Sequence, residues 1–245
     1  MASDEVRLAP IGWAAVGVAG VTAIWAVDEL PAIGWFAALA YLTASSALLL
    51  AALGRRRFER FGWANAVTSA RSALVAMITG LVVASFVEPI SVPLLIGLVI
   101  PALTLDAVDG WVARRTGTTT ELGARFDMEV DAFLLLVLSV YVAPRLGPWV
   151  LAIGLMRYVF VAAGWFLPWM RLPLPPRYWR KVVTAAQGIA LTVAASGLVP
   201  RLAGLLVAVA LALLVESFGR DVTWLALRRS AIMPSAEFGP RSPWR

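Results

Sequence analysis

Four aspartates stand in or beside apolar stretches long enough to cross a membrane: Asp106, Asp109, Asp127 and Asp131. A carboxylate at the centre of a membrane helix costs about 2.5–3.5 kcal/mol. Carboxylates that lie close together also repel each other, and one or two divalent cations would offset both costs. The four aspartates therefore predict an intramembrane metal centre.

The spacing of the aspartates places them on two helix faces. At about 100° per residue, Asp106 and Asp109 share one face of a helix, and Asp127 and Asp131 share one face of the next helix. Three small residues lie on the same faces: Gly110, Ala113 and Gly123. They remove side-chain bulk, which allows either close helix packing or access of a bulky ligand.

The chain contains no cysteine and no histidine. This excludes a thiol nucleophile, a histidine base, a disulfide framework and a zinc site built from cysteine and histidine. Carboxylates, arginines, one lysine and hydroxyls remain. Such an inventory suits a hard cation bound through oxygen, namely Mg²⁺ or Mn²⁺.

The elements that must position these residues are membrane helices. Hydrophobic residues make up 60% of the 245 residues, and the mean hydropathy of +0.82 is far above that of a soluble domain. Apolar runs predict eight helices, at about 11–27, 32–53, 65–87, 90–115, 120–143, 147–169, 182–198 and 201–219. Asp4 and Glu5 precede the first run and no convincing cleavage site follows, so we interpret it as a membrane helix rather than a signal peptide. We expect an all-α integral membrane protein.

Basic residues gather in alternate loops, around positions 55–60, 114–115, 171–181 and 220–229. This positive-inside pattern places those loops, both termini and the aspartates on the cytoplasmic side of the cell (inner) membrane. The net charge of +6 is thereby explained by topology, and we expect no nucleic-acid partner.

Other charged residues also lie within the runs. Glu129 follows Arg125 by four residues and points away from Asp127, so we interpret Glu129 and Arg125 as a structural ion pair. Arg157 lies deep in the sixth run, where an unpaired arginine is costly. We expect a partner carboxylate or an anionic acceptor substrate beside Arg157.

The segment DAVDGWVARRTGTTTELGARFDMEVD resembles the signature of the CDP-alcohol phosphotransferase family, also called CDP-alcohol phosphatidyltransferases. That signature reads D-x-x-D-G-x-x-A-R, eight residues, then G-x-x-x-D-x-x-x-D, and every fixed position matches. A chance match in a chain of this length is on the order of one in ten million. The upstream segment NAVTSAR, with Asn65, Thr68 and Arg71, is similar to a pattern in the family's first core helix.

The resemblance implies a six-helix catalytic core at residues 65–219. Residues 1–54 would be two additional N-terminal transmembrane helices, residues 55–64 an interfacial basic segment, and residues 220–245 a partly disordered cytoplasmic tail. It further implies two Mg²⁺ or Mn²⁺ ions on Asp106, Asp109, Asp127 and Asp131, with Asp131 also acting as the catalytic base. The donor nucleotide would meet Asn65, Thr68, Gly110, Ala113, Arg114 and Gly123.

The implied reaction transfers a substituted phosphate from a CDP-alcohol to a hydroxyl acceptor and releases CMP, in phospholipid synthesis. The apolar setting favours CDP-diacylglycerol as donor, with a small polar acceptor that is either phosphorylated or not. We expect the acceptor to meet Arg157, Arg177 and Lys181. The family's G-K-x-K-T-x-x-Q pattern is altered here to RKVVTAAQ, with Arg180 and Val183 at two of its positions, so the acceptor is left open. The resemblance also implies a homodimer.

Two other functions are compatible with intramembrane aspartates. One is an intramembrane prenyltransferase, which also binds a diphosphate through Mg²⁺ but carries its acidic motifs on separated helices. The other is a cation transporter, which would use the aspartates as a transit site. The single compact acidic block favours the phosphotransferase.

Overall fold

The computed structural model describes Gly12 and residues 15–26, 31–55, 63–116, 121–172, 174–175 and 177–232. Within these ranges, residues 50, 52–55, 63–66, 107–116, 121–122 and 229–232 are described by their backbone alone. The predicted interfacial segment at 55–64 falls largely outside the described residues, as do residues 233–245 of the predicted tail.

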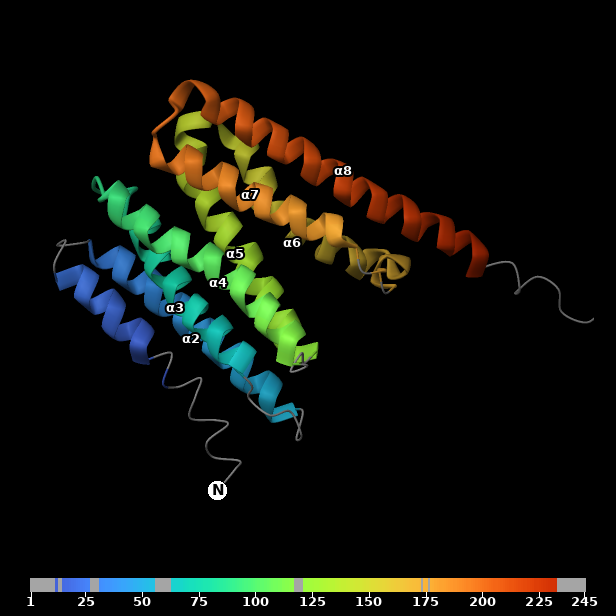
Figure 1. Ribbon diagram of the computed structural model, residues 1–245, viewed down its shortest axis with the longest axis horizontal. Coiled ribbons are helices and arrows are strands. Elements are labelled where there is room, and N and C mark those ends of the chain that lie inside the picture. Colours follow the sequence, from blue (N-terminus) through green and yellow to red (C-terminus); the bar gives the residue numbers. More distant parts are fainter. Residues whose placement is uncertain are drawn as a thin grey trace, which may run out of the picture.

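The described chain is a bundle of helices without a strand (Figure 1). The helices are Ala15–Ala26, α2 (Ala32–Arg55), α3 (Trp63–Ala84), α4 (Val92–Thr116), α5 (Glu121–Leu146), α6 (Leu151–Phe166), α7 (Tyr178–Ser196) and α8 (Pro200–Ile232). Two short 3₁₀ turns, η1 (Pro148–Val150) and η2 (Pro168–Arg171), flank α6. Each predicted apolar run overlaps one of these helices, which confirms the all-α class.

Four of the described helices contain segments long and apolar enough to cross a membrane: Ala32–Leu49, Val67–Ala84, Pro148–Phe166 and Pro200–Arg228. Helix α4 contributes a shorter apolar segment, Val92–Asp106, and its remaining sequence carries Asp109, Arg114 and Arg115. The first turns of α5 are similarly rich in charge. The chain is therefore a membrane protein.

Helix α3 lies at the centre of the bundle. In its apolar segment 72% of the residues are buried, against 22% in that of α2 and 28% in that of α8. The reason is that α3 packs against α2, α4 and α5 at once. Figure 1 shows the N-terminal helices in blue along one edge and α8 in red along the opposite edge. A side chain on α3 can therefore meet groups from several helices.

The end of the last helix differs from the prediction. Residues 201–219 were expected to be helical, and the rest was assigned to a tail, but α8 continues to Ile232. Contacts beyond Phe218 explain this: Glu216 and Arg220 form an ion pair four residues apart, and Arg228 lies over the ring of Trp224 at 4.3 Å. The connector between α6 and α7 begins with the turn η2.

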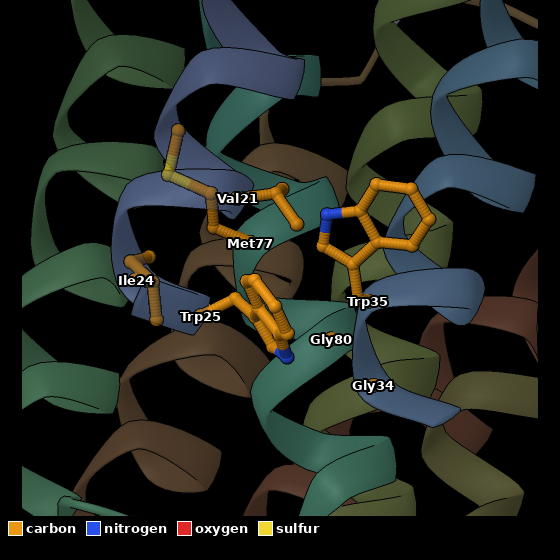
Figure 2. Close-up of a pocket in the computed structure, with 7 residues that line it drawn as sticks. All are labelled: Val21, Ile24, Trp25, Gly34, Trp35, Met77 and Gly80. Atoms are coloured by element: carbon orange, nitrogen blue, oxygen red, sulfur yellow. The ribbon is translucent and has the colours of Figure 1, made fainter. Parts of the chain in front are cut away.

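The two N-terminal helices pack together on α3. Val21 of the first helix, Ala38 and Leu42 of α2, and Ala76 of α3 form a small buried apolar cluster. Beside it lies a pocket, where Figure 2 shows the indole rings of Trp25 and Trp35. The pocket is lined by Val21, Ile24, Trp25, Gly34, Trp35, Met77 and Gly80. We call the helix Ala15–Ala26 together with α2 the N-terminal hairpin.

Candidate functional site

Three of the four aspartates converge in the structure. Asp106 comes from α4, and Asp127 and Asp131 from α5, with one carboxylate oxygen of each lying within 4.8 Å of the others. Their side chains are 41%, 29% and 22% exposed, respectively. Asp109 belongs to α4, but its side chain lies outside the described residues. The arrangement is a half-buried acidic centre that we call the aspartate centre.

Helix geometry explains the convergence. Asp127 and Asp131 are four residues apart and so lie one above the other on α5. Helices α3 and α7 each pack against both α4 and α5, which holds the aspartates of α4 and α5 around a common space. The periodicity of the sequence predicted the shared faces, and the packing of α3 and α7 brings those faces together.

Arg71 of α3 is the counter-charge of the aspartate centre. Its side chain is fully buried, and its Nη1 donates to Oδ1 of Asp106 at 3.0 Å and to Oδ1 of Asp127 at 2.8 Å. Its Nη2 donates to Oδ1 of Asp131 and to the backbone carbonyl of Asp127 at 3.4 Å. A buried arginine is tolerated only when such acceptors surround it. The guanidinium is planar and carries several N–H donors, so this one group can donate to all three carboxylates.

The residues present fit a divalent cation. Three ionised carboxylates and one guanidinium leave a formal charge of −2 among the described groups, equal and opposite to that of one divalent ion. Carboxylate oxygens are the ligands that Mg²⁺ prefers. Each carboxylate offers about four lone-pair sites, so a bond from Arg71 to one oxygen does not exhaust it. Asp106, Asp127 and Asp131 would hold the ion.

Two predicted donor-binding residues lie one turn from this centre. Thr68 is buried on α3, three residues before Arg71, and Gly123 is half-buried on α5, four residues before Asp127. The other four belong to α3 and α4, but their side chains lie outside the described residues: Asn65, Gly110, Ala113 and Arg114. Thr68 and Gly123 thus each lie one helical turn before a residue of the centre.

Arg157 has a carboxylate partner. Its Nη2 on α6 donates to Oε1 of Glu129 on α5, and their side chains are 30% and 55% exposed. Sequence spacing assigned Glu129 to Arg125 of its own helix, whereas the structure brings in an arginine from the next helix. The partner carboxylate that the sequence analysis required for Arg157 is therefore Glu129.

The basic residues of α7 lie at its first turn. Arg180 forms an ion pair with Asp221 of α8, in which Nη2 donates to Oδ1 at 3.0 Å and Nε lies 2.9 Å from Oδ2. Arg177 Nη1 is 3.9 Å from the same carboxylate. Asp221 is buried, whereas Lys181 is exposed. Asp221 thus neutralises part of the basic cluster, and Lys181 remains accessible at this end of α7.

Sequence reasoning missed the roles of Arg71 and Asp221. Arg71 was noted only as part of a weak pattern, although it is an arginine inside an apolar run, which is as costly as the aspartates were judged to be. Applying the same argument to Arg71 would have identified it as their counter-ion. Asp221 was assigned to the tail, where its place directly after Arg220, in the basic cluster at 220–229, was the available signal.

The pocket of Figure 2 is not part of this centre. Met77 and Gly80, which line it, follow Arg71 by six and nine residues on α3, or about 9 and 13 Å along the helix axis. The pocket therefore belongs to the packing of the N-terminal hairpin.

Fold and site together define an all-helical membrane protein whose clustered carboxylates can hold a metal ion. Residues 61–216 match the family model for CDP-alcohol phosphatidyltransferase, which covers well over half of the chain. The chain belongs to the CDP-alcohol phosphatidyltransferase family, as its signature indicated. Comparisons with curated proteins and with solved structures gave no match.

Family membership supports a membrane transferase that moves a phosphate group from a CDP-alcohol to a hydroxyl acceptor, in a family that generally uses a divalent metal. The matched region begins just before α3 and ends within α8. The N-terminal hairpin lies outside it.

Proposed function

We propose that this protein transfers the phosphatidyl group of CDP-diacylglycerol to a small polar alcohol and releases CMP. The observation that carries the proposal is the convergence of Asp106, Asp127 and Asp131 on the buried Arg71, within a chain of the CDP-alcohol phosphatidyltransferase family. The apolar surroundings of the centre favour a lipid-linked donor over a soluble one.

The aspartates would bind two Mg²⁺ or Mn²⁺ ions, with Asp109 completing the set. When bound, these ions would draw charge from the phosphate oxygens and from the leaving CMP. The acceptor oxygen attacks the phosphorus that carries the diacylglycerol, and the bond from that phosphorus to the CMP oxygen breaks. The negative charge that develops during the transfer would thus be offset by the bound ions.

The proton of the acceptor hydroxyl would pass to the carboxylate of Asp131. Arg71 donates to Asp131 and so holds this carboxylate in place. Arg71 also bonds to Asp127 and Asp106, so it holds the base and the metal ligands in one fixed arrangement. Asn65, Thr68, Gly110, Ala113, Arg114 and Gly123 would bind the nucleotide.

The first turn of α7 is the proposed acceptor side. A side chain at Gly188 would meet Leu103 of α4 at 2.8 Å, so α7 packs closely on α4 at that level. The two helices are antiparallel (Figure 1), so the first turn of α7 lies toward the end of α4 that follows Leu103, which supports an acceptor side there. Arg177 and Lys181 would attract the acceptor there. Arg157, held by Glu129, is a third candidate.

We also propose that the aspartates and both termini face the cytoplasm of the cell (inner) membrane. The alternating basic loops support this orientation, since positive residues are retained on the cytoplasmic side. A homodimer is proposed from the family resemblance alone.

The test is CMP release by the purified full-length protein in detergent micelles that contain CDP-diacylglycerol and Mg²⁺ or Mn²⁺. Glycerol 3-phosphate, inositol 1-phosphate, inositol and serine are supplied in turn as acceptors. We expect one of them to support metal-dependent CMP release. We expect Asp127→Asn to abolish it and Glu88→Gln, an exposed carboxylate outside the centre, to retain it.

Each alternative has its own outcome in this assay. CMP release only from a soluble CDP-alcohol would show that the donor is soluble and not CDP-diacylglycerol. Diphosphate release from a prenyl diphosphate would favour the prenyltransferase. Metal-dependent cation flux in vesicles without CMP release would favour the transporter. If Lys181→Gln raised the acceptor KM while the donor KM stayed constant, the acceptor side would be supported.

A further inference from the structure

The N-terminal hairpin lies outside the matched family region, yet it packs very closely on the helix that carries Arg71. A Cβ on Gly34 of α2 would lie 2.5 Å from the carbonyl oxygen of Gly80 on α3, and a Cβ on Gly80 would lie 2.9 Å from the carbonyl oxygen of Gly34. Backbones approach this closely only where both residues lack side chains. Helix α2 is thus seated on α3 in a defined register.

At the level of Arg71, α2 contacts α3 through hydroxyl groups. Ser72, the residue after Arg71, lies with its Oγ 3.3 Å from the hydroxyl of Tyr41 and 3.4 Å from Oγ of Ser45, both on α2. Ser72 and Ser45 are buried. Polar contacts in an apolar region are costly to break, because few alternative partners are available. They fix the turn of α3 from which Arg71 projects.

Tyr41 also contacts α5. Its ring stacks on that of Phe133, with centroids 4.6 Å apart and an interplanar angle of 21°. Phe133 follows Asp131 by two residues, so the two side chains leave α5 on different sides. Arg71 therefore holds α5 from α3, while Tyr41 holds it from α2. Two separate contacts restrain the rotation of α5 about its axis, and that rotation determines where Asp131 points.

We propose that α2 is a positioning element for the aspartate centre and that Tyr41 is its principal residue. Tyr41 contacts the turn that carries Arg71 and the turn that carries Asp131, and so sets their relative position. The expected effect of Tyr41 on the rate of CMP release rests on the proposed transfer reaction. A displacement of about 1 Å in such a centre can lower a rate by about 100-fold.

The kinetic test compares three variants of the full-length protein. Tyr41→Ala removes the stack and the hydroxyl, and we expect kcat for CMP release to fall by about 10- to 100-fold while the donor KM changes little. Tyr41→Phe keeps the ring, and we expect most of the rate to be retained. Phe36→Ala is the control, because it deletes an aromatic ring of α2 that is 63% exposed.

A purely structural role would give a different pattern. Tyr41→Ala would then lower the unfolding midpoint or the yield but leave kcat per folded molecule at the wild-type value, and this result would overturn the proposal. Equal losses of kcat in Tyr41→Ala and Phe36→Ala would also overturn it, because they would show a general effect of packing on α2.

A cross-link tests the contact without reference to activity. Because the chain has no cysteine, Ser45→Cys with Ser72→Cys creates a single pair that can form a disulfide. We expect oxidation to link the pair and the linked protein to keep its rate. Failure to cross-link, or loss of rate that reduction restores, would contradict the seating of α2 on which the inference depends.

Metal binding tests the positioning role separately from the proposed transfer reaction. Should the wild-type protein release no CMP, Mn²⁺ binding to the purified protein is measured instead. We expect Tyr41→Ala to weaken Mn²⁺ binding by about tenfold, which is typical for the loss of a residue that holds the metal ligands in position. Phe36→Ala should leave Mn²⁺ binding unchanged. Equal affinities, or no Mn²⁺ binding in the wild type, would overturn the positioning role.

Discussion

At the scale of single residues, Arg71 decides how three membrane carboxylates can lie together. Fully buried, it donates to Asp106, Asp127 and Asp131. One guanidinium offsets part of their mutual repulsion and leaves the remaining charge for a metal ion. The same contacts hold a proposed base and proposed metal ligands in a common geometry.

Replacing Arg71 tests whether its positive charge offsets the repulsion among the three carboxylates. Removing one partner of a buried ion pair costs about 3–5 kcal/mol, so Arg71→Leu should lower the unfolding midpoint in detergent, and added Mn²⁺ should restore part of it. Arg71→Lys keeps the charge but loses the planar fork. We expect it to fold and to release CMP about 10- to 100-fold more slowly.

The matched control for these variants is Arg145→Lys. Arg145 lies at the other end of α5 and bonds to the carbonyl of Ala195 at 3.2 Å. It should leave the rate unchanged. An Arg71→Leu protein as stable as the wild type in metal-free buffer would contradict the counter-ion role.

At the scale of elements, the close approach of α2 and α3 at Gly34 and Gly80 determines how the N-terminal hairpin is seated. In Gly34→Ala, a methyl group would lie 2.5 Å from a backbone oxygen, which has no flexible side chain to give way. Overpacking of this kind costs about 1–3 kcal/mol, so we expect a lower unfolding midpoint and, if α2 positions the centre, a lower kcat.

Gly97→Ala is the matched control, since a methyl group there would meet nothing within 4 Å. In an exposed helical position, alanine should leave stability unchanged or raise it by about 0.5–1 kcal/mol. If Gly34→Ala and Gly97→Ala behaved alike in thermal unfolding, the helices would not be as tightly seated as the structure has them.

At the scale of the whole molecule, metal binding should stabilise the fold, because the candidate ligands come from two helices, α4 and α5. A ligand that binds only the folded protein stabilises it by about 2.7 kcal/mol at 100 times its Kd. We therefore expect Mn²⁺ to raise the unfolding midpoint of the wild type and of Glu88→Gln, and to have little effect on Asp127→Asn. Equal shifts in all three proteins would place the ion elsewhere.

Much of this protein could be predicted from its sequence, because membrane helices are encoded locally. Hydropathy located every described helix, and the spacing of Asp127 and Asp131 indicated that they share a face of α5. The signature identified the family that the family model confirms. The end of α8 was missed, since one of the contacts that hold its extension, Asp221 with Arg180, joins residues of different helices.

The sequence by itself thus determined the class of protein, the positions of its helices and the residue types of its aspartate centre. Only the tertiary structure decided which residues are partners: Arg71 for the aspartates, Arg157 for Glu129, and Tyr41 for Ser72 and Phe133. The physical reason is the distance along the chain over which each effect acts. Hydropathy and helical periodicity act over a few residues, whereas a partner on another helix is selected by how the helices pack, and that depends on the whole bundle at once.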